Sequence, residues 1–232
     1  MYAQKTNARQ SAGEQSSNVL FQALAERDQT LGEHLEGVTA LAVAVGVKLG
    51  VEPDVLHQLR WAARLHDVGK MAVPESILLK PGRLDEREWE FVRRHTVVGQ
   101  RILEAAPSLG GTGAVVRSSH ERWDGTGYPD GLAGEDIPLA ARVVAVCDAF
   151  DAMVSDRPYR PALSVSEALQ ELARGAGTQF DTAVVTAFLG VLAERQPSRA
   201  SVSEPGELAL RARLRVVEAE DDPPQLAAAG SQ

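Results

Sequence analysis

The sequence predicts an all-α protein, a single helical-bundle domain of about seven to nine helices between flexible ends. Aromatic residues make up only 5% of the 232 residues, and alanine, leucine and valine fill most apolar positions, which favours helix over sheet. Apolar residues also recur at helical spacing in several segments. The segment 142–147 is compatible with a buried strand, but the length and alanine content of 139–155 favour a helix there as well.

Helix boundaries follow from residues that start or stop helices. Asp85 with Glu88 resembles a capping box. Asp181 is expected to cap the last core helix, and Ser164 or Ser166 the helix before it. The expected segments are a disordered end over 1–17, one domain over 18–195 with helices over 19–27, 34–50, 53–67, 85–95, 97–106, 114–120, 139–155, 164–173 and 181–192, and a flexible acidic tail over 196–232.

Composition and charge exclude several classes of function. With 24 lysine and arginine residues against 32 aspartate and glutamate residues, the formal net charge is −8, which argues against a general nucleic-acid binder. No run of about 18 apolar residues is present to span a membrane, and the first residues lack the apolar core of a signal peptide. The single cysteine, Cys147, fits a small core residue in a reducing cytoplasm. We therefore expect a cytoplasmic protein that binds neither nucleic acid nor membrane.

The first candidate site is the run His-Asp-Val-Gly-Lys at 66–70, which follows an apolar helical segment. His66 and Lys70 are four residues apart and would share a helical face, and the short carboxylate of Asp67 can reach the same point. A neutral imidazole and a carboxylate suit a divalent transition metal, and the ammonium could offset the charge of a phosphate. The alternative is an ordinary helix end, with cations in the last turn and a glycine near the cap.

Three further residues extend this candidate metal site. His95 is expected to end a helix, His120 precedes a Gly-rich loop, and Asp148 lies in the most apolar helix, where a lone carboxylate is costly unless paired or metal-bound. Ligands from several helices suit a site in the core of a bundle, and nitrogen and oxygen ligands point to iron, manganese or zinc. Two alternatives stay open: His95 as a helix C-terminal cation, and Asp148 paired with Arg142 or Arg157.

Six motifs resemble, in order and spacing, those of the HD-GYP domain over about residues 20–192. They are the run at 66–70, Ile-Leu-Leu-Lys at 77–80, Gly-Tyr-Pro at 127–129, Asp-Ala-Phe-Asp-Ala-Met at 148–153, Arg-Pro-Tyr-Arg at 157–160 and Gly-Thr-Gln-Phe-Asp at 177–181. The resemblance implies an HD-type helical bundle from the HD superfamily of metal-dependent phosphohydrolases. It also implies a phosphodiesterase that hydrolyses the bacterial second messenger cyclic di-GMP to pGpG and onward to GMP.

The resemblance assigns roles to the residues at matching positions. It implies two divalent metal ions, iron or manganese. The implied catalytic residues are Asp67, which bridges the two ions, and Lys70, which contacts the scissile phosphate. The implied metal ligands are His66, Asp67, His95, His120 and Asp148, with His34 at the position of a histidine that serves a third metal in some members. The implied substrate-binding residues are Lys70, Asp151, Arg157, Arg160 and the loop of Gly127, Tyr128 and Pro129. The two arginines also suit phosphate through their planar guanidinium groups, and a solvated turn is the alternative for them.

Three departures from the family pattern bear on activity. Ser119 stands where the family has the first of two adjacent histidines, so one nitrogen ligand is missing. Gly37 replaces a usual arginine, and Thr30 stands where members with a third metal can carry a glutamate, so we expect two metals. The alternative function is a weakened or inactive module that binds cyclic di-GMP or a protein partner. Nucleotide or alarmone hydrolysis is disfavoured because the 127–129 and 157–160 motifs belong to the HD-GYP branch.

The expected ligand is a cyclic dinucleotide, and the expected context is bacterial signal transduction. No sensory or receiver domain is recognisable in the first 17 residues, so we expect regulation through a partner, oligomerisation or expression. The Gly-Tyr-Pro loop is the candidate docking surface for a signalling protein. A homodimer is the candidate assembly.

Overall fold

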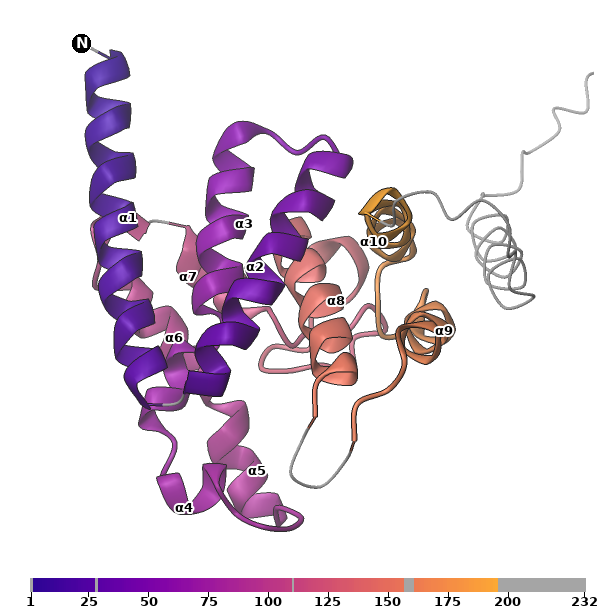
Figure 1. Cartoon of the computed structure of the whole chain (residues 1–232). Coiled ribbons are helices and arrows are strands. Elements are labelled where there is room, and N and C mark those ends of the chain that lie inside the picture. Colours follow the sequence, from indigo (N-terminus) through magenta and orange to yellow (C-terminus); the bar gives the residue numbers. More distant parts are fainter. Residues whose placement is uncertain (1, 28, 110, 157–160, 196–232) are drawn as a thin grey trace, which may run out of the picture.

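The computed structural model describes residues 2–27, 29–109, 111–156 and 161–195, with side chains from residue 12 onward apart from 27–31. Helices build this part of the chain (Figure 1), and its only β feature is an isolated bridge between Ala176 and Phe180. The elements are α1 (Tyr2–Arg27), α2 (Gln29–Lys48), α3 (Pro53–Leu65), η1 (Val68–Ala72), α4 (Glu75–Leu78), α5 (Glu86–Arg93), α6 (His95–Glu104), η2 (Pro107–Leu109), α7 (Thr112–Arg117), η3 (Gly134–Asp136), α8 (Leu139–Val154), α9 (Val165–Gly175) and α10 (Thr182–Arg195). The predicted all-α fold class is confirmed. None of the described helices is both long and apolar enough to cross a membrane.

Helix α8 forms the centre of the bundle and brings an acid to the edge of the core. It packs against α2 and α3 on one side and against α9 and α10 on the other (Figure 1). Because neighbours cover most of its circumference, α8 is apolar on nearly all sides, the pattern of a core helix. Cys147 is fully buried in it, as expected for a small core residue. The next residue, Asp148, keeps 22% of its side chain exposed, so it lies where the core meets solvent.

Three helix starts agree with the sequence signals. Asp85 and Glu88 form both hydrogen bonds of a capping box at α5, with lengths of 2.9 Å and 2.8 Å. Ser164 rather than Ser166 caps α9. Asp181 accepts a backbone N–H two residues further on, at 2.8 Å, where α10 begins. These caps satisfy backbone donors that the first turn of a helix leaves without partners.

The N-terminal segment differs from the expectation. Residues 1–17 were expected to be disordered, but α1 is helical from residue 2. Small residues let it pack closely: a Cβ on Gly13 would lie 2.5 Å from the indole ring of Trp61. The hydroxyls of Ser16 and Ser108 lie 3.1 Å apart and join α1 to η2. The polar composition concealed the N-terminal part of this helix because its contacts use small residues, whereas the apolar residues Phe21 and Leu24 pack in the part that was expected to be helical.

Two helix ends near the candidate metal site also differ from the expectation. Helix α3 ends at Leu65 and His66 is its C-cap, so the helical face expected to join His66 with Lys70 does not form. Lys70 lies instead in the 3-10 helix η1. Helix α5 ends at Arg93, and His95 begins α6 where it was expected to end a helix. Both of these helix boundaries lie next to the contact between η1 and α6.

The elements η1 and α6 touch backbone to backbone. A Cβ on Gly69 would lie 1.8 Å from the carbonyl oxygen of His95 and 2.6 Å from the amide nitrogen of Gly99. Only glycine permits so close an approach between two segments of backbone. Because Asp67 and His95 flank this contact, it sets the separation of two candidate metal ligands.

Replacing Gly69 with alanine should push η1 away from α6, because the new methyl group would overlap the His95 carbonyl. We expect the free energy of unfolding to fall by about 1–3 kcal/mol, the usual cost of overpacking, and metal binding to weaken. Urea denaturation followed by circular dichroism measures the first effect, and metal analysis measures the second.

The matched control is Gly50→Ala. Gly50 has φ +68° and open space where a Cβ would stand, so this change adds backbone strain of about 1–2 kcal/mol without displacing a neighbour. Its metal binding should equal that of the parent protein. Equal metal binding by the Gly69 and Gly50 variants would contradict the role assigned to the η1–α6 contact.

Candidate active site

Five of the predicted ligand residues meet in two groups that share one carboxylate. Within each group the ligand atoms lie within 4.8 Å of one another. The side chains come from α2, the end of α3, the residue before η1, the start of α6 and the turn after α7, so distant parts of the sequence converge here. Asp148 of α8 adjoins the first group, with Oδ1 3.6 Å from Nε2 of His66. The two groups are His34, His66 and Asp67, and Asp67, His95 and His120.

Hydrogen bonds fix which ring nitrogen of two histidines faces this site. Nδ1 of His66 donates to the carbonyl oxygen of Ala63 at 2.8 Å. Nδ1 of His95 donates in the same way to Val92 at 2.5 Å. A carbonyl oxygen only accepts, so each neutral ring carries its proton on Nδ1 and presents the lone pair of Nε2. Those lone pairs face Asp67, at 3.7 Å from Oδ2 and 3.5 Å from Oδ1, so backbone carbonyls hold both rings in the orientation of ligands.

Four buried atoms of these groups have no hydrogen-bond partner within the described protein: Nε2 of His66, His95 and His120 and Oδ1 of Asp67. Burying polar atoms without partners costs free energy, so a buried cluster of lone pairs favours a cation between them. The separations of 3.5 Å and 3.7 Å are too long for hydrogen bonds and suit two atoms that share one ion at about 2.0–2.2 Å. The residues therefore fit a divalent metal held by nitrogen and oxygen ligands.

Burial keeps two of these histidines neutral. It lowers the pKa of His120 to about 4, and it also lowers the pKa of His95. Both rings are therefore unprotonated at neutral pH, the form that binds a metal. His95 also stands at the start of α6, where the helix dipole disfavours a cation, so the interpretation of His95 as a helix C-terminal cation is wrong.

Asp67 is the shared carboxylate, and it stays ionised. Burial alone would raise its pKa, but electrostatic interactions, the largest of them with the ammonium of Lys70 and the others with His66 and His95, outweigh burial and hold that pKa well below its usual range. Nζ of Lys70 donates to Oδ2 of Asp67 at 2.6 Å, and the lysine side chain is 31% exposed. The ammonium therefore stands between the buried carboxylate and solvent.

His34 lies between two carboxylates of α8. Its Nε2 is 3.1 Å from Oδ1 of Asp148, and its Nδ1 is 2.6 Å from Oδ2 of Asp151. Burial lowers the pKa of His34, but hydrogen bonds to the two carboxylates outweigh burial and raise it to about 9. Arg142, one expected partner of Asp148, pairs instead with Asp181 at 2.6 Å. Within the described residues Asp148 is thus paired with histidines.

The Gly-Tyr-Pro loop lies against the second group. The ring of Tyr128 stacks on that of His120, with centroids 5.2 Å apart and planes 11° from parallel. A Cβ on Gly127 would lie 2.5 Å from Cα of Glu121, so the loop passes too close for any larger residue. Oε1 of Glu121 accepts the N–H of Asp130 at 2.7 Å and holds the far end of the loop. The peptide bond that follows Tyr128 is cis.

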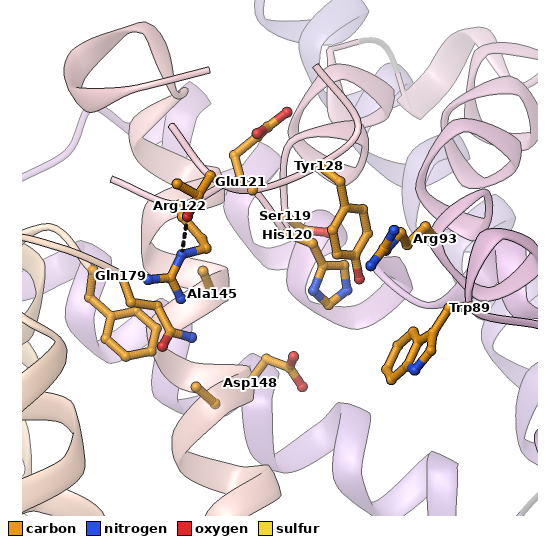
Figure 2. A pocket seen from close by; sticks show the side chains of 14 residues that line it. Trp89, Arg93, Ser119, His120, Glu121, Arg122, Tyr128, Ala145, Asp148 and Gln179 are labelled. Atoms are coloured by element: carbon orange, nitrogen blue, oxygen red, sulfur yellow. Dashed lines mark hydrogen bonds between the residues drawn. The ribbon is translucent and has the colours of Figure 1, made fainter. Parts of the chain in front are cut away.

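A cleft of about 360 Å³ opens beside the second group. Trp89 and Arg93 are four residues apart on α5, and Gln179 belongs to the 177–181 motif, so helical spacing and that motif were the available signals for them. No role was predicted from the sequence for these three residues or for Arg122. Figure 2 shows that the cleft has two walls. Trp89 and Arg93 form one wall, and Arg122 and Gln179 form the other. The candidate ligands His120 and Asp148 lie between these walls.

Ser119, the main departure from the family pattern, does not offer its oxygen to the metal groups. Its Oγ donates to the carbonyl oxygen of Val116 at 2.9 Å, and the residue is 2% exposed. It nevertheless lines the cleft beside His120. The position is therefore next to the second group, but its hydroxyl is bound to the backbone of α7.

The remaining predicted site residues are not all brought to the cleft. A Cβ on Gly37 would lie 3.0 Å from Oδ1 of Asp151, so this carboxylate stands close to the position where the family has an arginine side chain. Two of the predicted substrate-binding residues, Gly127 and Tyr128, line the cleft. Three others do not line it: Lys70, Pro129 and Asp151. The described part of the chain does not include Arg157, Arg160 or the side chain of Thr30.

Comparisons with known proteins agree with this arrangement. A cyclic di-GMP phosphodiesterase of Thermotoga maritima is 41% identical over 165 residues, which cover 70% of this chain and 45% of that protein. The cyclic di-GMP phosphodiesterase response regulator RpfG of Xanthomonas campestris is 42% identical over 172 residues, 73% of this chain and 46% of the relative. The 3'3'-cGAMP-specific phosphodiesterase 2 of Vibrio cholerae is 33% identical, over 73% of this chain and 33% of its own length. The chain thus spans less than half the length of these relatives.

Solved structures show the same fold. Bd1817, an HDG"Y"P protein from Bdellovibrio bacteriovorus, superposes with a TM-score of 0.60 at 20% identity, over 81% of this chain and 63% of the other. The HD domain family matches residues 18–184, and proteins of that family bind divalent metals. The chain belongs to the HD domain family, and its motifs resemble those of the HD-GYP branch.

Proposed function

We propose that this chain is a metal-dependent phosphodiesterase that hydrolyses cyclic di-GMP to pGpG or GMP in bacterial signalling. The observation that carries the proposal is the set of four buried, unpartnered ligand atoms around Asp67, next to a cleft. The names of the relatives, cyclic di-GMP and cyclic GMP-AMP phosphodiesterases, support a cyclic dinucleotide as the substrate class.

The proposed cofactors are two divalent ions, iron or manganese, with Asp67 as the ligand common to both. The proposed ligands are His66, Asp67, His95, His120 and Asp148, with His34 as a further candidate. When bound, such ions lower the pKa of a coordinated water and offset charge on the phosphate oxygens. The two groups share Asp67 through different oxygens: Oδ2 faces His66 and Oδ1 faces His95, which supports a bridging role.

The protein's own side chains orient the substrate and stabilise its charge. Lys70, held at Asp67, offers an ammonium for the scissile phosphate. Tyr128 covers one face of His120 and excludes water from it. Asp151, with Arg157 and Arg160, and Gly127 with Pro129 complete the substrate set that we carry over from the family motif.

The proposal includes a cellular location and binding partners. The one cysteine is buried and free, which suits the reducing cytoplasm. The Gly-Tyr-Pro loop is the proposed docking surface for a signalling protein, and a homodimer is the proposed assembly. We propose no contact with nucleic acid or membrane, in keeping with the net charge of −8.

Replacing His95 with alanine should remove one ligand from the second group and leave the first group intact. We expect metal content per chain to fall by about half, and cyclic di-GMP turnover to fall on the order of 100-fold, because the second group would lose its ion and the charge stabilisation that this ion would supply. Mass spectrometry of the metals in protein purified without oxygen, with chromatography of pGpG and GMP, measures both effects.

His57→Ala is the matched control, because His57 belongs to neither group and its ring lies 6.0 Å from that of Trp61. This variant should keep the metal content and turnover of the parent. Unchanged metal content in the His95 variant would refute the assignment of the second group. Absence of pGpG and GMP from parent protein loaded with Mn²⁺ or Fe²⁺ would count against hydrolysis itself.

Ser119→His should restore the nitrogen ligand that the family pattern has and this chain lacks. The Ser119 side chain borders the cleft next to His120, so an imidazole there can reach the second group. We expect metal affinity to rise about tenfold or more, the usual effect of completing a coordination shell, with turnover rising in parallel. A parent without activity and a variant with activity would favour the alternative, a native binding module.

A further inference from the structure

Helix α5 presents a large aromatic ring to the cleft and buries none of its own residues. Trp89 is 42% exposed and lines the cleft, where Figure 2 shows it beside Arg93 and across from Gln179. An indole that stays partly exposed to water gains only part of the free energy of burial, and this ring is not part of the hydrophobic core. Its exposed face is therefore available to a flat ligand that enters the cleft.

Polar contacts hold this ring in position. Glu88, the residue before Trp89, closes the capping box of α5 and accepts Nζ of Lys80 at both carboxylate oxygens, at 2.7 Å and 2.6 Å. Lys80 belongs to the Ile-Leu-Leu-Lys motif at 77–80, to which neither the metal groups nor the Gly-Tyr-Pro loop gives a role. The motif thus ties α5 to the preceding segment and orders the helix that carries the ring.

Positive charge lies on the same face of α5. Arg93 is one helical turn beyond Trp89, so both side chains point to the cleft. Arg93 lies next to Tyr128 (Figure 2) and acts electrostatically on the pKa of that phenol. A flat aromatic ring beside a guanidinium is the combination that binds a base and its phosphate in single-stranded nucleotides.

We infer that Trp89 is the stacking platform for one purine base of the cyclic dinucleotide, with Arg93 facing the adjoining phosphate. The inference rests on the proposed function, and it adds a residue that determines affinity for the base. Stacking is tolerant of base identity because every base has a π-face, so guanine and adenine both fit. The chain would then accept cyclic di-GMP and cyclic GMP-AMP with similar KM values.

The first test compares two exposed aromatic residues of the same helix. Phe91 is 49% exposed, lies two residues from Trp89 and does not line the cleft, so Phe91→Ala is the matched control. In metal-loaded full-length protein, Trp89→Ala should raise KM for cyclic di-GMP about tenfold or more with kcat within about twofold, and Trp89→Phe should restore most of the affinity. Phe91→Ala should match the parent. An unchanged KM in Trp89→Ala would overturn the inference.

The second test reports the contact directly. The phosphorothioate analogue of cyclic di-GMP, which resists hydrolysis, should quench tryptophan fluorescence of the parent protein. Trp89→Phe should remove that quenching, and Trp61→Phe, which changes a buried ring, should retain it. Quenching that persists in Trp89→Phe would overturn the inference.

The outcomes separate this inference from the proposed function. Hydrolysis by the parent together with quenching that survives in Trp89→Phe would remove the platform and leave the enzyme. Quenching lost in Trp89→Phe without any hydrolysis by the parent would keep the platform and turn the chain into a binding module. A parent that neither hydrolyses nor is quenched would refute both.

Discussion

The backbone contact between η1 and α6 is the constraint on which the candidate active site depends. Gly69 lets the carbonyl of His95 approach so closely that no side chain could stand between the two segments. Asp67 and His95 therefore face each other from elements that are distant in the sequence. The same carboxylate turns its second oxygen to His66 and Lys70, so one glycine places the centre of both ligand groups.

The charges of the site are arranged around this shared carboxylate. Burial favours neutral rings at His95 and His120, and the ammonium of Lys70 is the main group that keeps Asp67 ionised despite its burial. The result is a set of lone pairs and one negative charge enclosed in an apolar bundle. Such a set is unfavourable by itself, and a bound cation relieves it, so metal binding would also stabilise the fold.

Local chemistry made much of this predictable. The capping residues act within one helical turn, so the sequence alone identified Asp85 and Asp181 and narrowed the third cap to Ser164 or Ser166. The ligand types were predictable because His66 and Asp67 stand side by side in a recognisable motif. Their meeting with ligands from other helices was inferred from the histidines and the acid of the apolar helix, and the family resemblance then assigned each of them a role.

Tertiary contacts account for what the sequence did not predict. The part of helix α1 before residue 19 was missed because Gly13 packs through the absence of a side chain, which no hydrophobic pattern records. His95 was placed at the wrong end of a helix because no glycine or proline marks the break between α5 and α6. Trp89 and Gln179 look like ordinary surface residues until the fold sets them on opposite walls of one cleft.

The Lys80–Glu88 ion pair, which ties α5 to the preceding segment, makes the wall that carries Trp89 respond to salt differently from the buried ligand groups. The Lys80–Glu88 pair is partly exposed, at 35% and 22%, whereas the carboxylate of Asp67 is 3% exposed. Dissolved salt screens exposed pairs strongly and buried ones weakly. Raising the ionic strength should therefore weaken the ion pair that holds the wall carrying Trp89, while the buried contacts of Asp67 stay almost unchanged.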